Sequence, residues 1–452
     1  MFKKVLIANR GEIAVRIIRA CHELGINTVA IYSEADRDAL HVRLADEAYC
    51  IGPSQAKKSY LDISRIIEAA KAAKADAIHP GYGFLAENAD FADACVNYNI
   101  AYIGASGEAI RKMGDKAVAR KTMQEAGVPV VPGTQDLIHD EQEARLTAEK
   151  IGYPVLIKAT AGGGGKGMRV VEDSTDLVKA LRQAAQEAER SFGNAGVYLE
   201  KYLTHSRHVE IQIMADNHGN VVYLGERDCS TQRRHQKVIE EAPSPVVSPD
   251  MRKEMGKAAV NAAKAVNYSG AGTVEFIVDK DRNFYFMEMN TRIQVEHPVT
   301  EMVTGTDLIK TQIMVAAGEV LPWTQHDIHM NGWAIECRIN AEDPLHNFMP
   351  CPGRITKYKP PFGNGIRVDS AMYKDYLITP FYDSMIAKLI VWAPTRAEAI
   401  DKMEEALSNF KIEGVNTTIN LQKKILTTEA FKNAVIDTNY LEEHLEEILN
   451  KY

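Results

Sequence analysis

The chain has 452 residues, a formal net charge of −8 at neutral pH, 45% apolar residues and 25% charged residues. This length and ordinary composition predict about two to four globular domains, at roughly 100–200 residues each, and exclude a single small binding module or a disordered protein. The acidic balance argues against nucleic acid as a partner, because any phosphate binding must then come from local clusters of basic residues.

The sequence shows no sign of membrane insertion or export. No apolar run approaches the roughly 20 residues of a membrane-spanning helix. The apolar stretch near the N-terminus, residues 5–8, is too short for the core of a signal peptide. The six cysteines include no Cys-x-x-Cys pair, so we expect reduced, mostly structural thiols. These features predict a mature, cytoplasmic protein with no membrane role.

The first hundred residues alternate short β-branched runs with helical periodicity, as in a parallel sheet covered by helices. We expect strands over residues 5–8, 28–32, 77–79 and 101–103. Helices are expected where apolar residues recur at helical spacing, over 13–21 and 63–70. This pattern predicts a Rossmann-like domain. Asn9-Arg10-Gly11-Glu12 replaces the glycine fingerprint after the first strand, so a dinucleotide site is not expected there.

The middle and C-terminal parts follow a different order of elements. Residues 115–125 are predicted to form a helix, and residues 128–133, with two prolines, form a stiff connector at a domain boundary. A small α/β unit follows, with a strand at 155–159 and a helix at about 175–190. Residues 208–290 are rich in predicted strands, with one helix near 251–266, and more strands follow Trp333. Thr395-Arg396-Ala397-Glu398 is a capping box that opens an amphipathic helix.

The first candidate site is a glycine-rich segment, residues 161–167, between the strand at 155–159 and a predicted strand at 168–171. It contains Gly-x-Gly-x-x-Gly but closes a hairpin, and Lys166 is followed by glycine rather than by the Ser or Thr of a P-loop. Bare N–H groups can wrap a polyphosphate, and Lys158 and Lys166 supply positive charge. The segment therefore predicts a phosphate lid, with a plain surface turn as the alternative.

The second candidate site is a pair of acidic strands, residues 273–279 and 284–290, joined by a four-residue turn. If Asp279 pairs with Phe284, Glu275 faces Glu288 across the hairpin and Asn290 lies on the same face. Such oxygen ligands suit Mg²⁺ or Mn²⁺, with nucleotide phosphates completing the coordination. The alternative is a solvent-facing strand pair with harmless acids.

Two more polar groups lie before this hairpin. Residues 226–237 combine basic residues with specific hydrogen-bonding groups such as His235, which indicates an anion site, although a solvated charged face is the usual alternative. His208, Glu210 and Gln212 share one face of a strand whose other face is apolar. That polar row is either part of a site or plain surface.

The last candidate group follows the hairpin directly. Arg292 offers a bidentate fork for a small planar anion, and Glu296 beside it can serve as a general base. Structural salt bridges would explain either residue alone. They explain less well why both residues follow the proposed metal ligands.

Together these segments resemble the biotin carboxylase branch of the ATP-grasp ligases over nearly the whole chain. The resemblance rests on residues 7–13, 79–84, the glycine-rich segment, 227–237, 288–298 and 336–342. It implies an α/β (α+β) ATP-grasp fold with a Rossmann-like N-terminal domain over 1–114. The ATP-grasp domain would span 115–330, with a mobile glycine-rich lid subdomain at about 133–203, and a C-terminal biotin carboxylase domain would span 331–452. One departure is Ala161, where some relatives have glycine.

The resemblance also implies roles for individual residues. The implied ATP-binding residues are Lys116, Lys158, Gly164, Gly165, Glu200, Lys201, Leu203, His208, His235, Glu275 and Glu288. The implied metal positions, for two Mg²⁺ or Mn²⁺ ions, are Glu275, Glu288 and Asn290. The implied bicarbonate and biotin positions are Lys237, Arg292, Gln294, Val295, Glu296 and Arg338. Of these, the implied catalytic residues are Lys237, Arg292, Glu296 and Arg338.

The implied reaction has two steps. Glu296 deprotonates bicarbonate, which attacks the γ-phosphate of ATP to give carboxyphosphate. The CO₂ that this intermediate releases then carboxylates the ureido nitrogen of biotin, whose enolate Arg338 stabilises. The chain has no Met-Lys-Met signature, so biotin should arrive on a separate biotin carboxyl carrier protein. The resemblance further implies carboxyltransferase subunits as partners, a homodimer, and the first half-reaction of acetyl-CoA carboxylase in fatty acid synthesis.

Two other functions compete with this interpretation. An ATP-grasp ligase of the carbamoyl-phosphate type would also use bicarbonate but would need ammonia instead of biotin. A nucleotide-binding regulatory protein without turnover would not need the intact set of acidic and basic site residues. The sequence leaves open whether the final acceptor is acetyl-CoA, another acyl-CoA or a keto acid.

Overall fold

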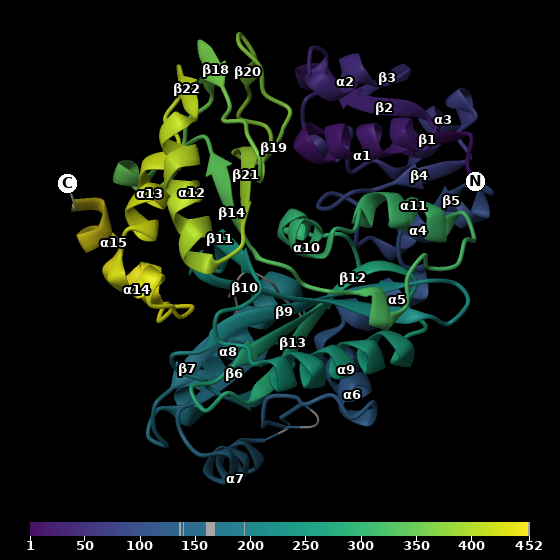
Figure 1. The fold of residues 1–452 in the computed structure, drawn as a ribbon. Coiled ribbons are helices and arrows are strands. Elements are labelled where there is room, and N and C mark those ends of the chain that lie inside the picture. Colours follow the sequence, from purple (N-terminus) through teal and green to yellow (C-terminus); the bar gives the residue numbers. More distant parts are fainter. Residues whose placement is uncertain (135–136, 139, 160–167, 194, 451–452) are drawn as a thin grey trace.

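Three larger β-sheets, of five, eight and three strands, organise the chain (Figure 1). The computed structural model describes residues 1–134, 137–138, 140–159, 168–193 and 195–450. Helices cover the sheets on several sides, which confirms the mixed α/β class that the sequence predicts. Among the helices of these residues, none is long and apolar enough to cross a membrane.

The N-terminal sheet is parallel, with strand order β3-β2-β1-β4-β5, as expected of a Rossmann-like domain. Its strands are β1 (Lys4–Ile7), β2 (Asn27–Ser33), β3 (Glu47–Gly52), β4 (Ala77–His79) and β5 (Ala101–Tyr102). Its helices are α1 (Gly11–Glu23), α2 (Leu40–Leu44), α3 (Ile63–Ala73), α4 (Ala89–Asn97) and α5 (Gly107–Gly114). β3 is not among the strands predicted from the sequence, because this edge strand carries mostly half-exposed and exposed side chains rather than an apolar run.

The eight-stranded sheet has the order β13-β12-β9-β10-β11-β14-β21-β19, with antiparallel pairing throughout. Its strands are β9 (Arg207–Ala215), β10 (Val221–Arg233), β11 (Gln236–Ala242), β12 (Gly270–Val278), β13 (Phe284–Asn290), β14 (Trp333–Asn340), β19 (Ile366–Ser370) and β21 (Met385–Ala393). The sheet crosses the domain boundary proposed at residue 330, since β11 pairs with β14. The helices α6 (Lys116–Glu125), α9 (Pro249–Ala265), α10 (His297–Thr304) and α11 (Leu308–Ala316) accompany it.

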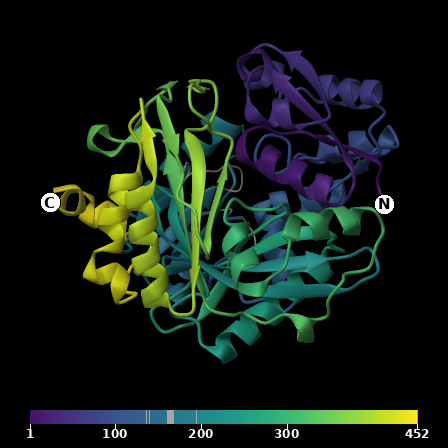
Figure 2. The same ribbon diagram turned by 45° about the horizontal axis from the view of Figure 1, so that its top comes forward.

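The C-terminal part covers the far end of this sheet. Helix α12 (Arg396–Asn409) begins at the predicted capping box, in which Thr395 and Glu398 each accept from the other's backbone N–H. The remaining helices are α13 (Ile419–Leu426), α14 (Glu429–Lys432) and α15 (Tyr440–Asn450). Short strands form two-stranded sheets: β15 (Glu342–Asp343) with β16 (Met349–Pro350), β17 (Gly353–Arg354) with β20 (Leu377–Ile378), and β18 (Lys357–Lys359) with β22 (Lys411–Glu413). Figure 2 shows these C-terminal elements beside the N-terminal sheet.

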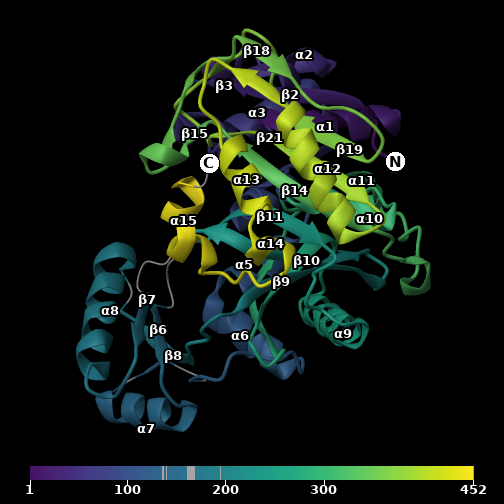
Figure 3. The same ribbon diagram turned by 60° about the vertical axis from the view of Figure 1, so that its left-hand side comes forward.

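A small unit stands apart from the rest of the molecule (Figure 3). It contains α7 (Glu141–Ile151), β6 (Val155–Ala159), β7 (Met168–Val171), α8 (Leu177–Phe192) and β8 (Val197–Lys201). Among the described residues, its apolar core, which includes Ala144, Ile157 and Leu199, is made of residues between 138 and 199. The glycine-rich segment, with Gly164 and Gly165, lies outside the described residues.

The connector at residues 128–133 is bonded to two sheets. The N–H of Phe286 on β13 donates to the carbonyl of Pro129 at 2.7 Å. The N–H of Lys201 on β8 donates to the carbonyl of Pro132 at 2.8 Å. The connector therefore joins the edge of the eight-stranded sheet to the edge of the small one.

Candidate active site

A cleft of about 1110 Å³ opens between the N-terminal sheet, the eight-stranded sheet and the small unit. Among the residues that line it are all the predicted site residues within the described part of the chain: Lys116, Lys158, Glu200, Lys201, Leu203, His208, His235, Lys237, Glu275, Glu288, Asn290, Arg292, Gln294, Val295, Glu296 and Arg338. Residues far apart in the sequence are thus brought together in one place.

The β12–β13 hairpin places Glu275 directly opposite Glu288 and Thr273 opposite Asn290. The predicted pairing of Asp279 with Phe284 is wrong, because Val278 pairs with Phe284 and the turn is one residue longer. A register shift beyond Glu275 corrects this difference, since Phe276 pairs with Phe286 and leaves Met287 as a bulge. The two glutamates face each other because the longer turn and the bulge compensate.

The oxygen atoms that the hairpin offers as ligands fit a divalent cation. Desolvation in the cleft and the negative charge of the facing Glu275 raise the pKa of Glu288. Burial would also raise the pKa of Glu275 itself, but Lys237 and His208 lower it well below the usual value. Asn290 Nδ2 donates to Glu275 Oε1 at 2.9 Å, which ties the amide to the same pair. Carboxylate and amide oxygens of this kind are typical Mg²⁺ or Mn²⁺ ligands.

Lys237 lies at the centre of the acidic residues. Its ammonium donates to Glu210 Oε2 at 2.6 Å, to Glu275 Oε1 at 3.1 Å and to Glu296 Oε1 at 2.6 Å. Burial opposes its charge, yet the anionic neighbours hold the pKa of Lys237 well above its ordinary value. Lys237 thus neutralises part of a carboxylate cluster drawn from three segments of the chain.

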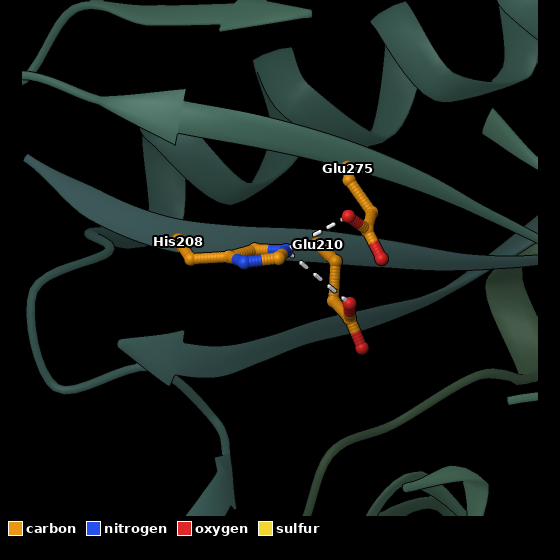
Figure 4. A group of neighbouring side chains, drawn as sticks. All are labelled: His208, Glu210 and Glu275. Carbon is orange, nitrogen blue, oxygen red and sulfur yellow. Dashed lines mark ion pairs between the residues drawn. The ribbon is translucent and has the colours of Figure 1, made fainter. Parts of the chain in front are cut away.

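The polar row on β9 belongs to this cluster and is not surface. His208 is 6% exposed, and Glu210 and Gln212 are 0% exposed. The Nε2 atom of His208 lies 3.1 Å from Glu275 Oε2 and 3.7 Å from Glu210 Oε2 (Figure 4). Burial disfavours the imidazolium, but Glu275 outweighs it and raises the pKa of His208. Hence the row is buried, with His208 lining the cleft, and the alternative of plain surface is wrong.

Two positively charged side chains hold Glu296 in place. Its Oε1 atom accepts from Lys237, and its Oε2 atom accepts from Arg338 at 2.9 Å. Burial would raise the pKa of Glu296, but Lys237, Arg338 and the nearby Arg227 lower it well below the usual value. The Nε atom of Arg338 donates to Glu240, and burial raises the pKa of this second glutamate to about 7. Glu296 is therefore an ionised carboxylate with a fixed orientation.

Arg292 is oriented by groups from two parts of the chain. Its Nε atom donates to Glu87 Oε2 at 2.7 Å, and one terminal nitrogen donates to Asn290 Oδ1 at 2.8 Å. Thr291 N also donates to Glu87, at 3.0 Å. Glu87 comes from the N-terminal domain, which therefore helps to position a residue predicted for the anion site.

Arg227 is a buried arginine whose hydrogen bonds reach five different side chains. Its Nε atom donates to Glu210, and its terminal nitrogens donate at 2.7–3.1 Å to Gln212, Thr300, Thr273 and Gln294. A guanidinium has five N–H donors, so all of them are used. Gln294 connects this hydrogen-bond network to the β12–β13 hairpin, because its Nε2 atom donates to Glu275 Oε1 at 2.7 Å.

The small unit and helix α6 bring other basic residues to the cleft. Lys158 pairs with Glu200 Oε2, while Arg120 Nη1 donates to Glu200 Oε1 at 2.8 Å. Lys116, at the start of α6, also lines the cleft. The ammonium of Lys201 donates instead to the carbonyls of residues 152 and 153, at 2.9 Å each, within the small unit.

Several residues of the site are missing from the set that the resemblance implies: Glu87, Arg120, Glu210, Arg227 and Glu240. Three of them are charged residues inside strands, and a charged residue there must find a buried partner. That signal could have identified Glu240. Glu210 and Arg227 already belong to two candidate groups of the sequence, the polar row and the segment 226–237, although no role is implied for them. Nothing in the local sequence of Glu87 or Arg120 indicates a partner in another part of the chain.

Comparison with family models divides the chain into three matches. Residues 1–110 match the model described as "Biotin carboxylase, N-terminal domain". Residues 115–324 match "Carbamoyl-phosphate synthase L chain, ATP binding domain", and residues 336–443 match "Biotin carboxylase C-terminal domain".

Individual relatives are similar over nearly their full length. The chain is 62% identical to "Biotin carboxylase 1" of Bacillus subtilis, over 98% of each chain. It is 56% identical to one of the pyruvate carboxylase subunits of Methanothermobacter thermautotrophicus, over 98% of this chain and 90% of the relative. A crystal structure of the biotin carboxylase domain dimer of Hydrogenobacter thermophilus 2-oxoglutarate carboxylase, in complex with MgADP, ADP and bicarbonate, matches with a TM-score of 0.93 and 52% identity. That match covers 100% of this chain and 99% of the other.

Proposed function

The chain belongs to the biotin carboxylase family, and from this premise we propose that it carboxylates biotin on a separate biotin carboxyl carrier protein, with bicarbonate and ATP as co-substrates. As a member of this family it is an ATP-dependent carboxylating ligase with the ATP-grasp fold. One observation carries the proposal. Glu296, the candidate base, is clamped between Lys237 and Arg338 in the same cleft as the Glu275–Glu288 pair.

In the first step, bicarbonate binds among Lys237, Arg292, Gln294 and Val295, and Glu296 takes its proton. The cations beside Glu296 keep it ionised but also weaken it as a base. Anionic substrates compete for Lys237 and Arg338, which frees the carboxylate and restores its basicity. The deprotonated bicarbonate then attacks the γ-phosphate of ATP, the bond to the β-phosphate breaks, and carboxyphosphate and ADP are formed.

In the second step, carboxyphosphate breaks down into CO₂ and phosphate, and the phosphate takes the proton of the ureido nitrogen of biotin. Negative charge develops on the ureido oxygen, where the Arg338 guanidinium stabilises it, and the nitrogen then attacks CO₂ to give carboxybiotin. Glu240 supports this role, because its hydrogen bond to Nε fixes the plane of the guanidinium.

ATP binds across the cleft between the small unit and the eight-stranded sheet. We assign its phosphates to Lys116, Lys158, Gly164 and Gly165. The remaining nucleotide contacts are assigned to Glu200, Lys201, Leu203, His208 and His235. Glu275, Glu288 and Asn290 would hold two Mg²⁺ or Mn²⁺ ions, which neutralise the phosphate charge when bound.

Bicarbonate-dependent ATP cleavage with free biotin as acceptor tests this function. We expect phosphate release that requires bicarbonate, and carboxybiotin that requires both bicarbonate and ATP. Carbamoyl phosphate formed with ammonia, in the absence of any carboxybiotin, would instead support a ligase of the carbamoyl-phosphate type. ATP binding without turnover would support the regulatory alternative.

The physiological acceptor is a finer proposal. We propose that the chain is the biotin carboxylase subunit of acetyl-CoA carboxylase and acts with carboxyltransferase subunits in fatty acid synthesis. This proposal is supported by the relatives in several organisms that are named biotin carboxylase. Other relatives are subunits of pyruvate and 2-oxoglutarate carboxylases. Two experiments distinguish these acceptors. The first identifies the biotinylated protein that co-purifies with the chain, and the second assays carboxylation of acetyl-CoA, pyruvate and 2-oxoglutarate.

The assembly and location are proposed on separate grounds. A dimer is supported by the dimeric biotin carboxylase domain among the structural matches, and the mass of the purified protein in solution tests it. A cytoplasmic location is supported by the six cysteines, all of which are free thiols, as in reducing compartments.

A further inference from the structure

Lys388 is a fully buried lysine behind the candidate active site. It lies on β21, its side chain is 0% exposed, and it is not among the residues that line the cleft. Removing an ammonium from water is costly, so a lysine in this position needs partners. Its partners show which part of the site it holds.

Three groups surround the ammonium of Lys388. Nζ donates to the carbonyl oxygen of Val295 at 2.7 Å, lies 3.1 Å from Glu12 Oε1 and lies 3.9 Å from Asp369 Oδ2. Glu12 belongs to α1 of the N-terminal domain and also accepts a hydrogen bond from the hydroxyl of Tyr82, which lines the cleft. Lys388 therefore links α1, a C-terminal strand and the main chain beside Glu296.

The charge of Lys388 is maintained by these neighbours. Burial opposes the charged form, yet Glu12, Glu336 and Asp369 hold the pKa of Lys388 above its ordinary value. Asp369 is engaged by Arg367, whose Nε donates to it at 2.9 Å. Glu12 is thus the nearest counter-ion that the ammonium has among the described residues.

The segment that Lys388 touches has no regular structure of its own. Residues 291–296 run between β13 and α10, and some of their carbonyl oxygens accept hydrogen bonds from side chains. The carbonyl of Gln294 accepts from His297 Nδ1 at 2.8 Å, and that of Val295 accepts from Lys388. The peptide unit that carries the Val295 carbonyl also carries the N–H of Glu296 and is planar. Fixing that oxygen therefore fixes the backbone of the candidate base.

We propose that Lys388 is a positioning residue for the bicarbonate site: held by Glu12, it fixes the peptide between Val295 and Glu296 and so orients the base. This inference rests on the proposed function. It also gives a role to Asn9-Arg10-Gly11-Glu12, which stands where a dinucleotide fingerprint would otherwise lie. The N-terminal domain then supplies a counter-ion to the site in addition to its scaffold.

The double variant Glu12→Gln/Lys388→Met tests this role. Lys388→Met alone leaves Glu12 as a buried carboxylate without a counter-ion and can fail to fold. The double variant removes both charges at nearly constant volume and keeps an acceptor for Tyr82. Because the charge-assisted bond to Val295 is lost, we expect the half-saturating bicarbonate concentration to rise about tenfold or more, against less than about threefold for ATP. The matched control is Lys357→Met, an exposed lysine paired with Glu413, which should behave as wild type.

Amide hydrogen exchange of peptides covering residues 291–297 gives a second measurement that is independent of activity. We expect faster exchange there in the double variant, with unchanged exchange in α12. Bicarbonate saturation and exchange both equal to wild type would overturn the proposal, since charge compensation alone would then explain the pair. If wild type itself shows no bicarbonate-dependent ATP cleavage, the proposed function fails, and hydrogen exchange alone decides whether Lys388 fixes the segment.

Discussion

Glu296 and Arg338 are bonded to each other in the cleft, yet their proposed roles belong to different steps. Glu296→Gln removes the base, so phosphate release and carboxybiotin formation should both fall by about 10²-fold or more. Arg338→Gln keeps a hydrogen-bonding group but loses the charge, so carboxyphosphate still forms and decays unproductively. The measurement is the ratio of phosphate to carboxybiotin for each variant. Wild-type coupling in Arg338→Gln, or carboxylation by Glu296→Gln, would contradict the assigned roles.

The hydrogen bonds of Arg227 predict how strongly its substitution lowers the stability of the fold. Arg227→Lys keeps the charge, but three donors on a flexible chain cannot replace five in a plane, so buried acceptors lose partners. We expect unfolding to become easier by about 2 kcal/mol or more, seen as a lower thermal midpoint. The control Arg182→Lys changes an arginine on α8 that is 68% exposed and pairs with Glu141, so its effect should stay within about 0.5 kcal/mol. Equal midpoints for the two variants would argue against the network.

Individual residues also show which parts of the site the sequence can predict and which it cannot. Each predicted site residue that the structure describes lines the cleft. Those from residue 288 to residue 296, and Arg338, lie in segments that carry the resemblance, whereas others such as Lys116 and His208 lie outside them. Glu87 and Arg120 escape prediction, since their partners are separated from them by 205 and 80 residues. Such contacts are set by how distant segments pack and leave no trace in local spacing.

At the level of single elements, the β12–β13 hairpin tests the metal assignment. Glu288→Gln leaves the strand pairing intact but removes one charge and one strong ligand. ATP turnover should fall by at least about tenfold at ordinary Mg²⁺ concentration, with partial recovery at higher concentration. A titration of activity with Mg²⁺ and Mn²⁺ measures this. Asp281→Asn, in the exposed turn of the same hairpin, is the control and should titrate as wild type. Normal turnover of Glu288→Gln at low Mg²⁺ would remove Glu288 from the metal site.

The hairpin also illustrates how far local patterns predict an element. The prediction that Glu275 faces Glu288 is correct, but the turn register on which it rests is wrong, and the bulge at Met287 restores the pairing. The bulge at Met287 could not be predicted, since a bulge depends on how the backbone satisfies both neighbours. The same limit applies to β3, whose pairing with β2 rather than its own side chains makes it a strand.

For the whole molecule, the distribution of apolar cores predicts how the chain unfolds. The core of the small unit includes Ile157 and draws only on that unit, whereas Ile335 lies in the core of the eight-stranded sheet. The N-terminal core is shared with residues such as Leu224 and Ile309 of the body. Calorimetry should therefore resolve a small transition from a main one, although family models divide the chain into three.

Two matched variants test this division. Ile157→Ala should lower only the small transition and Ile335→Ala only the main one, since both side chains are fully buried and each loss costs about 2–5 kcal/mol. A single transition that both variants shift would show that the cores unfold together. The sequence alone could not predict this grouping, because the proposed boundary at residue 330 does not show that β11 and β14 pair across it.

The connector at residues 128–133 has a consequence for solubility at high concentration. β13 is an edge strand, and an edge with free N–H and C=O groups can recruit strands from other molecules and start aggregation. The connector occupies part of that edge through the carbonyl of Pro129, and a proline has no N–H with which to continue the pairing. Pro132 meets the small sheet in the same way. The segment that joins the two sheets thereby also covers one edge of each, which should protect these two edges from edge-to-edge association.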